Sequence, residues 1–170
     1  MSSTESTRRV TIQDFNISRM TEHDLLAVVE IEETCGLSRW GWDAYHNEIA
    51  EGRGALMLVA RSAVSSADKE GEGGPLIVGF IAARFTAGEV HINNVAVRHA
   101  FRRRGIGAAL LERALAEGAR RGARTALLEV RAGNTAAQAL YARLGFRITG
   151  RRKGYYTEPP EDALVMNASI

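Results

Sequence analysis

A turn rich in arginine and glycine, residues 98–108, joins two segments whose patterns differ. Residues 90–97 alternate as a strand does, and the apolar spacing of residues 105–121 predicts an amphipathic helix. The first N–H groups of a helix lack internal partners, and the helix dipole places partial positive charge there. Gly105 and Gly107 would let a ligand reach this backbone. The turn therefore predicts a phosphate site, and the alternative is a solvated basic turn whose glycines serve packing.

The spacing of the glycines narrows the kind of phosphate that the turn would bind. A dinucleotide loop needs a third glycine where Leu110 stands, and a P-loop needs Gly-Lys followed by Ser or Thr, which the sequence lacks. What remains is R-x-x-G-x-G, formed by Arg102, Gly105 and Gly107. This pattern resembles the acetyl-CoA pyrophosphate loop of the GNAT superfamily of N-acetyltransferases. The resemblance implies acetyl-CoA as cosubstrate and maps its contacts onto Val95, Ala96, Val97, Arg102, Arg103, Arg104, Gly105, Ile106, Gly107, Ala108 and Asn134.

A second candidate group lies in residues 127–146, where a strand precedes an amphipathic helix. Alternation in the strand places Leu127, Glu129 and Arg131 on one face. Glutamate is depleted in strands, and burial raises the pKa of a carboxyl toward the range that suits a general base at neutral pH. The open alternative is that Glu129 forms a structural ion pair with Arg131 or another arginine.

The phrases LEVRAGN and ALYARLGF, together with NVAV and KGYY, are similar to the RimI-type N-terminal acetyltransferases, which modify a ribosomal protein. The resemblance implies direct transfer, in which Glu129 removes a proton from the amine and Tyr141 protonates the leaving thiolate. A backbone N–H near Val97 would polarise the thioester carbonyl. The pattern alone predicts that Tyr141, on the apolar face of its helix, is a core residue and that Asn134 is an N-cap.

Aromatic residues indicate where an acceptor would lie. Tyr155 and Tyr156 fall in the expected turn between the last two strands. In related N-terminal acetyltransferases, tyrosines at this place line the peptide slot. Trp40 and Trp42 stand between two predicted helices and would form the opposite wall. The alternative for both tryptophans is packing of a short helix on the sheet.

The sequence leaves the class of acceptor amine open. An α-amine has a pKa of about 7.7–8.0, against about 10.4 for lysine, so more of it is neutral at pH 7. This difference favours a protein N-terminus, such as that of a ribosomal protein. A small amine and a protein lysine are the alternatives, because the first half of the chain has no decisive specificity motif.

The charges of the two halves indicate their partners. The net charge is only +2, but acidic residues predominate in the first half and arginine in the second. A non-catalytic nucleic-acid-binding domain is a more distant alternative, disfavoured by the low net charge and by the lack of a stacking platform or helix-turn-helix signature. We hypothesise that Glu30, Glu32 and Glu33 attract a basic ribosomal-protein tail. No role follows for the loop 62–75 or for Arg151, Arg152 and Lys153.

Composition excludes several other classes of protein. The single cysteine, Cys35, excludes an internal disulfide, and the four histidines lack metal-ligand spacing, so we expect no metal. No apolar run approaches the roughly 20 residues of a membrane helix. The first residues also lack the apolar region of a secretory signal, so we expect a cytoplasmic protein that has no membrane partner.

The mixture of predicted strands and helices that must position these residues indicates an α/β (α+β) fold. We expect one domain over residues 9–170, after a flexible tail over residues 1–8. The resemblance implies the GNAT fold, a mixed, twisted central sheet flanked by helices and splayed between the strands near 90–97 and 125–131. Thr21 with Asp24 predicts a capping box, and Glu117 is expected on a helix face away from the core. The expected strands are 10–17, 55–61, 76–85, 90–97, 125–131, 146–155 and 163–168, with a Gly-rich hairpin loop at 62–75.

Overall fold

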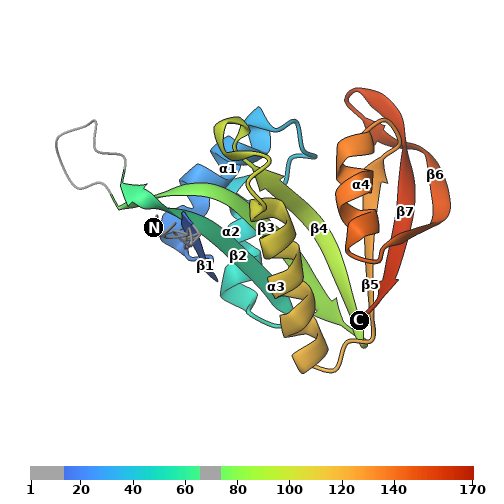
Figure 1. Cartoon of the computed structure of the whole chain (residues 1–170), viewed down its shortest axis with the longest axis horizontal. Helices are drawn as coiled ribbons and strands as arrows, with labels where there is room; N and C mark the ends of the chain where they lie inside the picture. The colour runs from blue at the N-terminus through green and yellow to red at the C-terminus, as the bar shows by residue number, and fades with distance from the viewer. Residues whose placement is uncertain (1–13, 66–73) are drawn as a thin grey trace, which may run out of the picture.

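The computed structural model describes residues 14–65 and 74–170, which form a sheet with helices on both faces (Figure 1). The strand order is β1-β2-β3-β4-β5-β7-β6, and β4 with β5 is the parallel pair among antiparallel ones. The strands are β1 (Phe15–Arg19), β2 (Ala55–Ser65), β3 (Pro75–Thr86), β4 (Glu89–Val97), β5 (Thr125–Arg131), β6 (Arg147–Thr157) and β7 (Pro160–Ser169). The helices are α1 (Leu25–Thr34), α2 (Gly41–Glu51), α3 (Ile106–Arg120) and α4 (Thr135–Arg143), with short 3-10 turns at Glu22–Asp24 and His99–Phe101. The predicted mixed sheet is confirmed.

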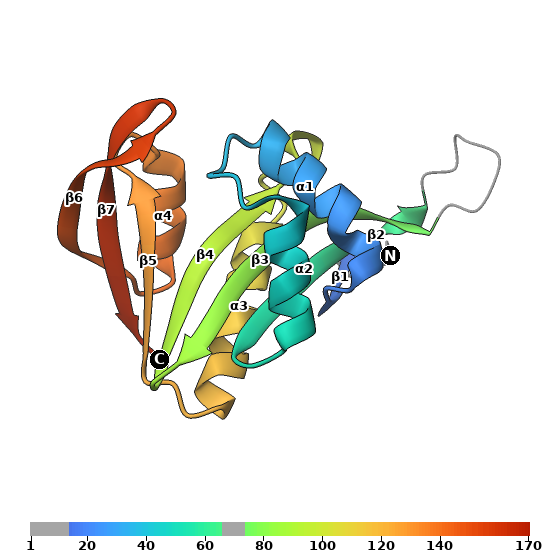
Figure 2. The same cartoon turned by 180° about the vertical axis from the view of Figure 1, so that it is seen from behind.

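Two apolar cores lie on opposite faces of the sheet. On one face, α3 and α4 pack over β2 to β5, where Leu110, Leu111 and Leu128 are buried. On the other face, α1 and α2 pack over β2 to β4 (Figure 2). Tyr45 of α2 meets Phe80 of β3 there, edge to face, with ring centroids 5.7 Å apart. The inner strands are therefore covered on both sides, which explains the nearly continuous apolar runs of β2 and β3.

A bulge in β4 changes the face that its side chains meet. The pairing with β3 skips Asn93, which lies between Ile92 and Asn94 as the extra residue of a β-bulge. Before the bulge, Ile92 is buried in the α3 core. After it, Asn94 points to the α2 side, where its amide donates to the Tyr45 hydroxyl at 2.8 Å. Consequently even-numbered residues of β4 face the α3 core before the bulge, and odd-numbered residues face it after the bulge.

The strands β4 and β5 pair only along their first residues. Their parallel ladder ends with Ile92 opposite Leu128, although β4 continues to Val97 and β5 to Arg131. Beyond that point the two strands diverge (Figure 2), so the predicted splay is confirmed. The separation leaves backbone groups of β4 without a β5 partner, and the chain proceeds from this end of β4 to α3.

The first elements form close to their predicted places. The first strand is Phe15–Arg19 instead of 10–17, and residues 10–13 lie outside the described part of the chain, as does the predicted tail. The capping box is confirmed, because the Thr21 N–H donates to the Asp24 carboxylate at 2.8 Å. The same carboxylate accepts two further bonds from Arg61 of β2, at 2.9 and 2.8 Å. The start of α1 is thereby tied to the sheet.

The hairpin prediction for the Gly-rich segment is also confirmed. β2 and β3 pair in antiparallel fashion as far as Ser65 opposite Pro75. Residues 66–73, which hold most of the predicted loop, lie outside the described residues.

The prediction for Glu117 is wrong. The residue is only 7% exposed, and Arg19 and Arg113 contact its carboxylate at 2.7 and 3.0 Å. The two guanidinium partners offset part of the cost of burying this carboxylate, which would be far larger for an unpaired charge. Periodicity within one helix could not show Arg19, which comes from β1.

Candidate active site

The turn before α3 adopts a conformation that exposes the helix N-terminus. Gly105, its N-cap, has φ of 79°, in the left-handed region that favours glycine, and Arg103 has φ of 62°. A Cβ on Gly105 would meet nothing within 4 Å, so its backbone, rather than crowding, accounts for the glycine. Within the described residues, no side chain caps the first N–H groups of α3. These groups and the open space around Gly105 fit a phosphate ligand such as the pyrophosphate of acetyl-CoA.

Arg102 joins this turn to the end of β4. Its Nε donates to the Val97 carbonyl at 3.0 Å, and one terminal nitrogen lies 3.4 Å from the Cys35 sulfur. Arg104 instead stacks over the Phe101 ring, 5.1 Å from its centre. Ile106 is buried in the α3 core, which fixes the first turn of the helix. Gly107 and Ala108 follow it and are partly buried.

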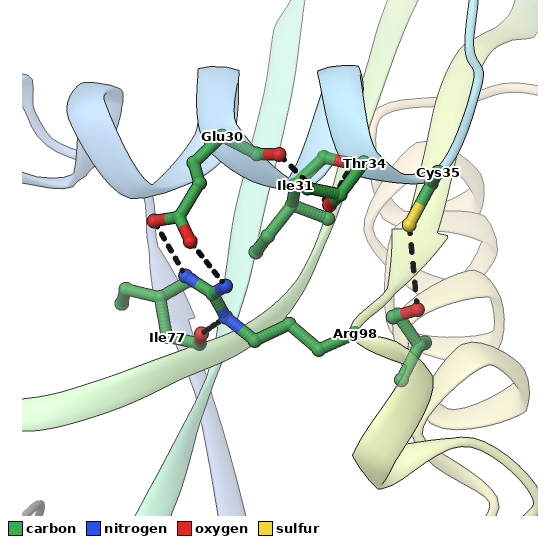
Figure 3. Close-up of polar contacts among 7 residues, drawn as sticks. Glu30, Ile31, Thr34, Cys35, Ile77 and Arg98 are labelled. Carbon is green, nitrogen blue, oxygen red and sulfur yellow. Dashed lines mark hydrogen bonds and ion pairs between the residues drawn. The ribbon is translucent and has the colours of Figure 1, made fainter.

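Arg98, which the sequence groups with the arginines of the turn, is held by α1. Its guanidinium forms two bonds to Glu30, at 3.0 and 3.2 Å, and its Nε donates to the Ile77 carbonyl at 2.7 Å (Figure 3). The bond from Arg98 lowers the pKa of the Glu30 carboxyl. The charge of Arg98 is already paired, so it contributes less to an anion site than its position in the sequence indicates.

The end of β4 combines buried and half-buried residues. Ala96 is buried on the α1 side, whereas Val95 and Val97 are partly buried against the α3 core. The Val97 carbonyl also accepts the Cys35 thiol at 3.6 Å (Figure 3). The three residues that the sequence assigns to acetyl-CoA therefore border the opening between β4 and β5.

Glu129 lies on the face of β5 that the alternation predicts. Ala126, Leu128 and Val130 are buried in the α3 core, so Glu129 projects from the opposite face. Its side chain is 9% exposed. The carboxylate is thus enclosed, yet it borders the side of the sheet that α1 and α2 cover.

The partners of Glu129 come from two other strands. One carboxylate oxygen lies 3.0 Å from His91 Nε2 on β4, and the other lies 3.5 Å from the Arg152 guanidinium on β6. The alternative to the general base was an ion pair with Arg131 or another arginine, and the arginine present is Arg152. His91 was not predicted, although the parallel pairing places it directly opposite Leu127. Its side chain is 37% exposed and so connects Glu129 with solvent.

Tyr141 of α4 is 7% exposed, and its ring lies 6.0 Å from that of Phe146. Burial, with a smaller contribution from Tyr156, raises the pKa of Tyr141 to about 12. The hydroxyl therefore stays protonated at neutral pH, which is the form that a proton donor needs. The predicted N-cap at the start of α4 is confirmed, since Asn134 Oδ1 accepts the Ala137 N–H at 3.1 Å.

Tyr155 and Tyr156 lie within β6, directly before its last residue, Thr157, so their predicted place in a turn is wrong. Tyr155 is 47% exposed, whereas Tyr156 is half-buried beneath the Arg131 guanidinium, 4.2 Å from its ring. Burial and the neighbouring Tyr155 raise the pKa of Tyr156 to about 12, and Glu129 adds to this rise. Tyr156 thus lies within electrostatic range of both Glu129 and Tyr141.

The basic run after Gly150 has partners that the sequence did not indicate. Arg151 pairs with Asp162 of β7 at 2.8 Å, and the N–H of Gly154 donates to the same carboxylate. Arg152 contacts Glu129 and lies 5.5 Å from the centre of the Tyr155 ring. These residues shape the β6 side of the site.

The two tryptophans occupy different environments. Trp40 precedes α2 and packs on the α1–α2 core, 5.4 Å from the Tyr45 ring, as the packing alternative predicts. Trp42 is 41% exposed and stacks on His46 at 4.6 Å. Neither tryptophan makes a contact with the predicted slot tyrosines that would unite them into one wall.

The hypothesis that three glutamates of α1 attract a basic tail is wrong for Glu32, which is fully buried. Glu30 is paired with Arg98 but its side chain is 61% exposed, and Glu33 is half-exposed with Arg39 at 3.9 Å. For these two residues the hypothesis stays a prediction.

Within residues 14–65 and 74–170, no group of three or more His, Cys, Asp or Glu residues is placed to hold a metal ion. None of the helices described is long and apolar enough to cross a membrane.

Comparisons with known proteins agree with this geometry. The model of the acetyltransferase (GNAT) family matches residues 25–146. A putative [ribosomal protein bS18]-alanine N-acetyltransferase of Bacillus subtilis is 31% identical over 91% of this chain and 95% of its own length. The [ribosomal protein bS18]-alanine N-acetyltransferase of Salmonella typhimurium is 33% identical over 91% and 97%. The crystal structure of the Escherichia coli ribosomal-protein-S18-alanine N-acetyltransferase superposes with a TM-score of 0.74 at 32% identity, covering 92% of this chain and 94% of that one. The chain therefore belongs to the GNAT family and is an N-acetyltransferase with the GNAT fold.

Proposed function

We propose that this enzyme transfers an acetyl group from acetyl-CoA to the α-amine of a protein N-terminus, with a ribosomal protein as the substrate class. Two relatives above 30% identity, aligned over nearly their full length, carry that activity in their names. The observation that carries the chemistry is the enclosed carboxylate of Glu129, beside the point where β4 and β5 separate.

Acetyl-CoA would bind across the splay. Its pyrophosphate would lie at the uncapped N-terminus of α3, near Gly105 and the arginines of the turn. The pantetheine arm would then run between β4 and β5 along Val95 to Val97, and Asn134 lies at the start of the next helix. This path brings the thioester toward the sheet face that carries Glu129.

Glu129 acts as the general base in this proposal. The incoming amine attacks the thioester carbonyl, the new C–N bond forms, and Glu129 takes the proton that the nitrogen must lose. His91 contacts the same carboxylate and is partly exposed, so it offers the proton a route to solvent. An α-amine suits such a base, because its pKa of about 7.7–8.0 leaves a useful fraction neutral at pH 7.

Tyr141 acts as the general acid. When the C–S bond breaks, its protonated hydroxyl supplies the proton that converts the thiolate to the CoA thiol, and solvent restores the hydroxyl. Its raised pKa keeps the hydroxyl protonated at neutral pH, so the proton is present when the C–S bond breaks.

The proposal is tested with matched peptides that carry a ribosomal-protein-like N-terminus and one internal lysine. One peptide has both amines free, a second has the α-amine blocked, and a third has the lysine blocked. Turnover of acetyl-CoA should persist when the lysine is blocked and disappear when the α-amine is blocked. The reverse pattern would identify a lysine acetyltransferase, and turnover of free small amines alone would replace the protein substrate.

A further inference from the structure

A fully buried carboxylate, that of Glu32, connects the α1–α2 segment to the middle of β4. Glu32 lies near the end of α1 and is 0% exposed. The N–H groups of Trp40 and Gly41 donate to its two oxygens at 2.7 and 3.1 Å, and the Tyr45 hydroxyl donates at 2.8 Å. A buried carboxylate costs much free energy unless hydrogen bonds compensate it, and here three donors do so.

Two of the donors to Glu32 lie at a helix start, where a negative charge is stabilised. Trp40 and Gly41 stand at the first turn of α2, where the helix dipole is positive. The chain then continues to β4, because the Asn94 amide donates to the Tyr45 hydroxyl at 2.8 Å. Each hydrogen bond in this series therefore points toward Glu32.

The hydrogen-bond network of Glu32 ends at Asn94, next to the residues of β4 that are assigned to acetyl-CoA. Asn94 directly follows the bulge residue of β4, and its own side chain is 6% exposed. The next three residues, 95–97, are those that the proposed function assigns to acetyl-CoA. The loop 35–40 between α1 and α2 borders the sheet face on which Glu129 opens, and in Figure 2 it extends toward the β5 side. One carboxylate thus holds both the loop and the strand.

We propose that the loop 35–40 forms one wall of the acceptor site and that Glu32 is a positioning residue that sets the distance between this loop and the acetyl-CoA strand β4; this rests on the proposed function. Glu32 does not touch the reacting atoms. It acts through Tyr45 and Asn94 on β4 and through Trp40 and Gly41 on the loop. Loss of the network should weaken acceptor use more than acetyl-CoA binding, because β4 stays paired with β3 along Asn94 to Val97. The turn before α3 also keeps its own contacts, although Cys35 of the loop lies 3.4 Å from Arg102.

The test compares Glu32→Gln with Glu51→Gln, the same change at an exposed residue at the end of α2. A glutamine at position 32 sets an amide donor against the donors of Trp40, Gly41 or Tyr45. We expect kcat/KM for the acceptor peptide to fall about tenfold or more, the size expected when a buried group loses its hydrogen bond. The KM for the peptide should rise, and calorimetric affinity for acetyl-CoA should stay within about twofold of wild type.

Tyr45→Phe separates positioning from folding. It removes the hydroxyl that joins Glu32 to Asn94 but keeps the ring packed on Phe80 and Trp40. We expect the same selective loss of peptide use, and the double variant with Glu32→Gln should lose less than the two single losses combined, because both break one network.

Peptide kinetics equal to wild type in both single variants would overturn the positioning role. An equal loss of acetyl-CoA affinity in both would also overturn it, since that result indicates general damage to the fold. If the wild-type enzyme acetylated a small amine or a lysine but no N-terminal peptide, the proposed function would be wrong. The role of Glu32 would then be tested by measuring kcat/KM of the Glu32 and Tyr45 variants with that acceptor.

Discussion

At the scale of single residues, the chemistry depends on how Glu129 is held. A carboxylate that is nearly enclosed would be costly without partners, and His91 and Arg152 supply them from neighbouring strands. The two contacts also fix the orientation of the oxygens. A base that is oriented before the substrate arrives loses less entropy during the reaction.

Substitution of Glu129 by Gln tests this role directly. The variant keeps the shape of the side chain and one acceptor oxygen but cannot accept the amine proton. We expect kcat/KM at pH 7 to fall about 10²- to 10⁴-fold, the usual contribution of a general base. Acetyl-CoA affinity, measured by calorimetry, should not change.

Glu112→Gln on the exposed surface of α3 is the control for charge. Wild-type kcat/KM in the Glu129→Gln variant would show that Glu129 is a structural ion-pair residue, the alternative that its contact with Arg152 keeps open.

Tyr141→Phe should lower kcat and also alter the stability of the protein in alkali. Folding raises the pKa of Tyr141 to about 12 from about 10 in the unfolded chain. The group therefore stabilises the folded state below about pH 10, and this contribution is lost as the pH rises toward 12. In urea titrations, the variant should lose less unfolding free energy between about pH 9 and pH 11 than wild type.

An unchanged kcat in Tyr141→Phe would remove Tyr141 as the acid, whatever its effect on stability.

Sequence patterns predict the faces of residues better than their partners. Alternation along β5 placed Glu129 correctly, and helical spacing placed Tyr141 in the core. Neither pattern shows His91 or Arg152, because those contacts depend on strand order and register. Glu32 was expected on the surface, because a run of glutamates is usually solvated. The donors that neutralise its charge lie in the following segment, so the pattern of α1 alone does not show them.

At the scale of elements, the turn before α3 and the bulge in β4 determine where a ligand can bind. The turn was predictable from its glycines and from the change of periodicity on either side. The bulge at Asn93 was not, because an alternating pattern contains no mark of one extra residue. Its effect is to present Asn94 to α2 while Ile92 stays in the α3 core.

Gly105→Ala should weaken both the fold and acetyl-CoA binding. A Cβ at φ of 79° costs about 1–2 kcal/mol. For a chain of this size, that cost lowers Tm by about 2–4 °C per kcal/mol. The N–H groups at the start of α3 also lose their alignment, so the Kd for acetyl-CoA should rise.

Gly88→Ala in the β3–β4 turn provides the matched control. Gly88 has φ of 82°, and a Cβ there also meets nothing within 4 Å. Both variants should lose similar thermal stability, but only Gly105→Ala should lose affinity in calorimetry. If Gly105→Ala and Gly88→Ala bound acetyl-CoA with equal affinity, the pyrophosphate would have to bind away from Gly105.

At the scale of the whole molecule, the sheet consists of two parts joined by a short ladder. The part from β1 to β4 carries α1, α2 and α3, and the part from β5 to β7 carries α4 (Figure 1). Glu129, Tyr141, Tyr155 and Tyr156 belong to the second part. The two parts meet where β4 and β5 pair, as far as Ile92 opposite Leu128. Acetyl-CoA in the splay would thus contact the first part, and the proposed base and acid come from the second.

The most direct test of the central claim is to locate the acetyl group on a peptide that carries a free N-terminal alanine and an internal lysine. The enzyme is incubated with acetyl-CoA and this peptide, and the product is sequenced by fragmentation mass spectrometry. The mechanism predicts acetylation at the α-nitrogen, at a rate about 10²- to 10⁴-fold lower with Glu129→Gln under the same conditions. Acetyl groups found on the lysine, or on the α-nitrogen at equal rates with Glu129→Gln, would contradict it.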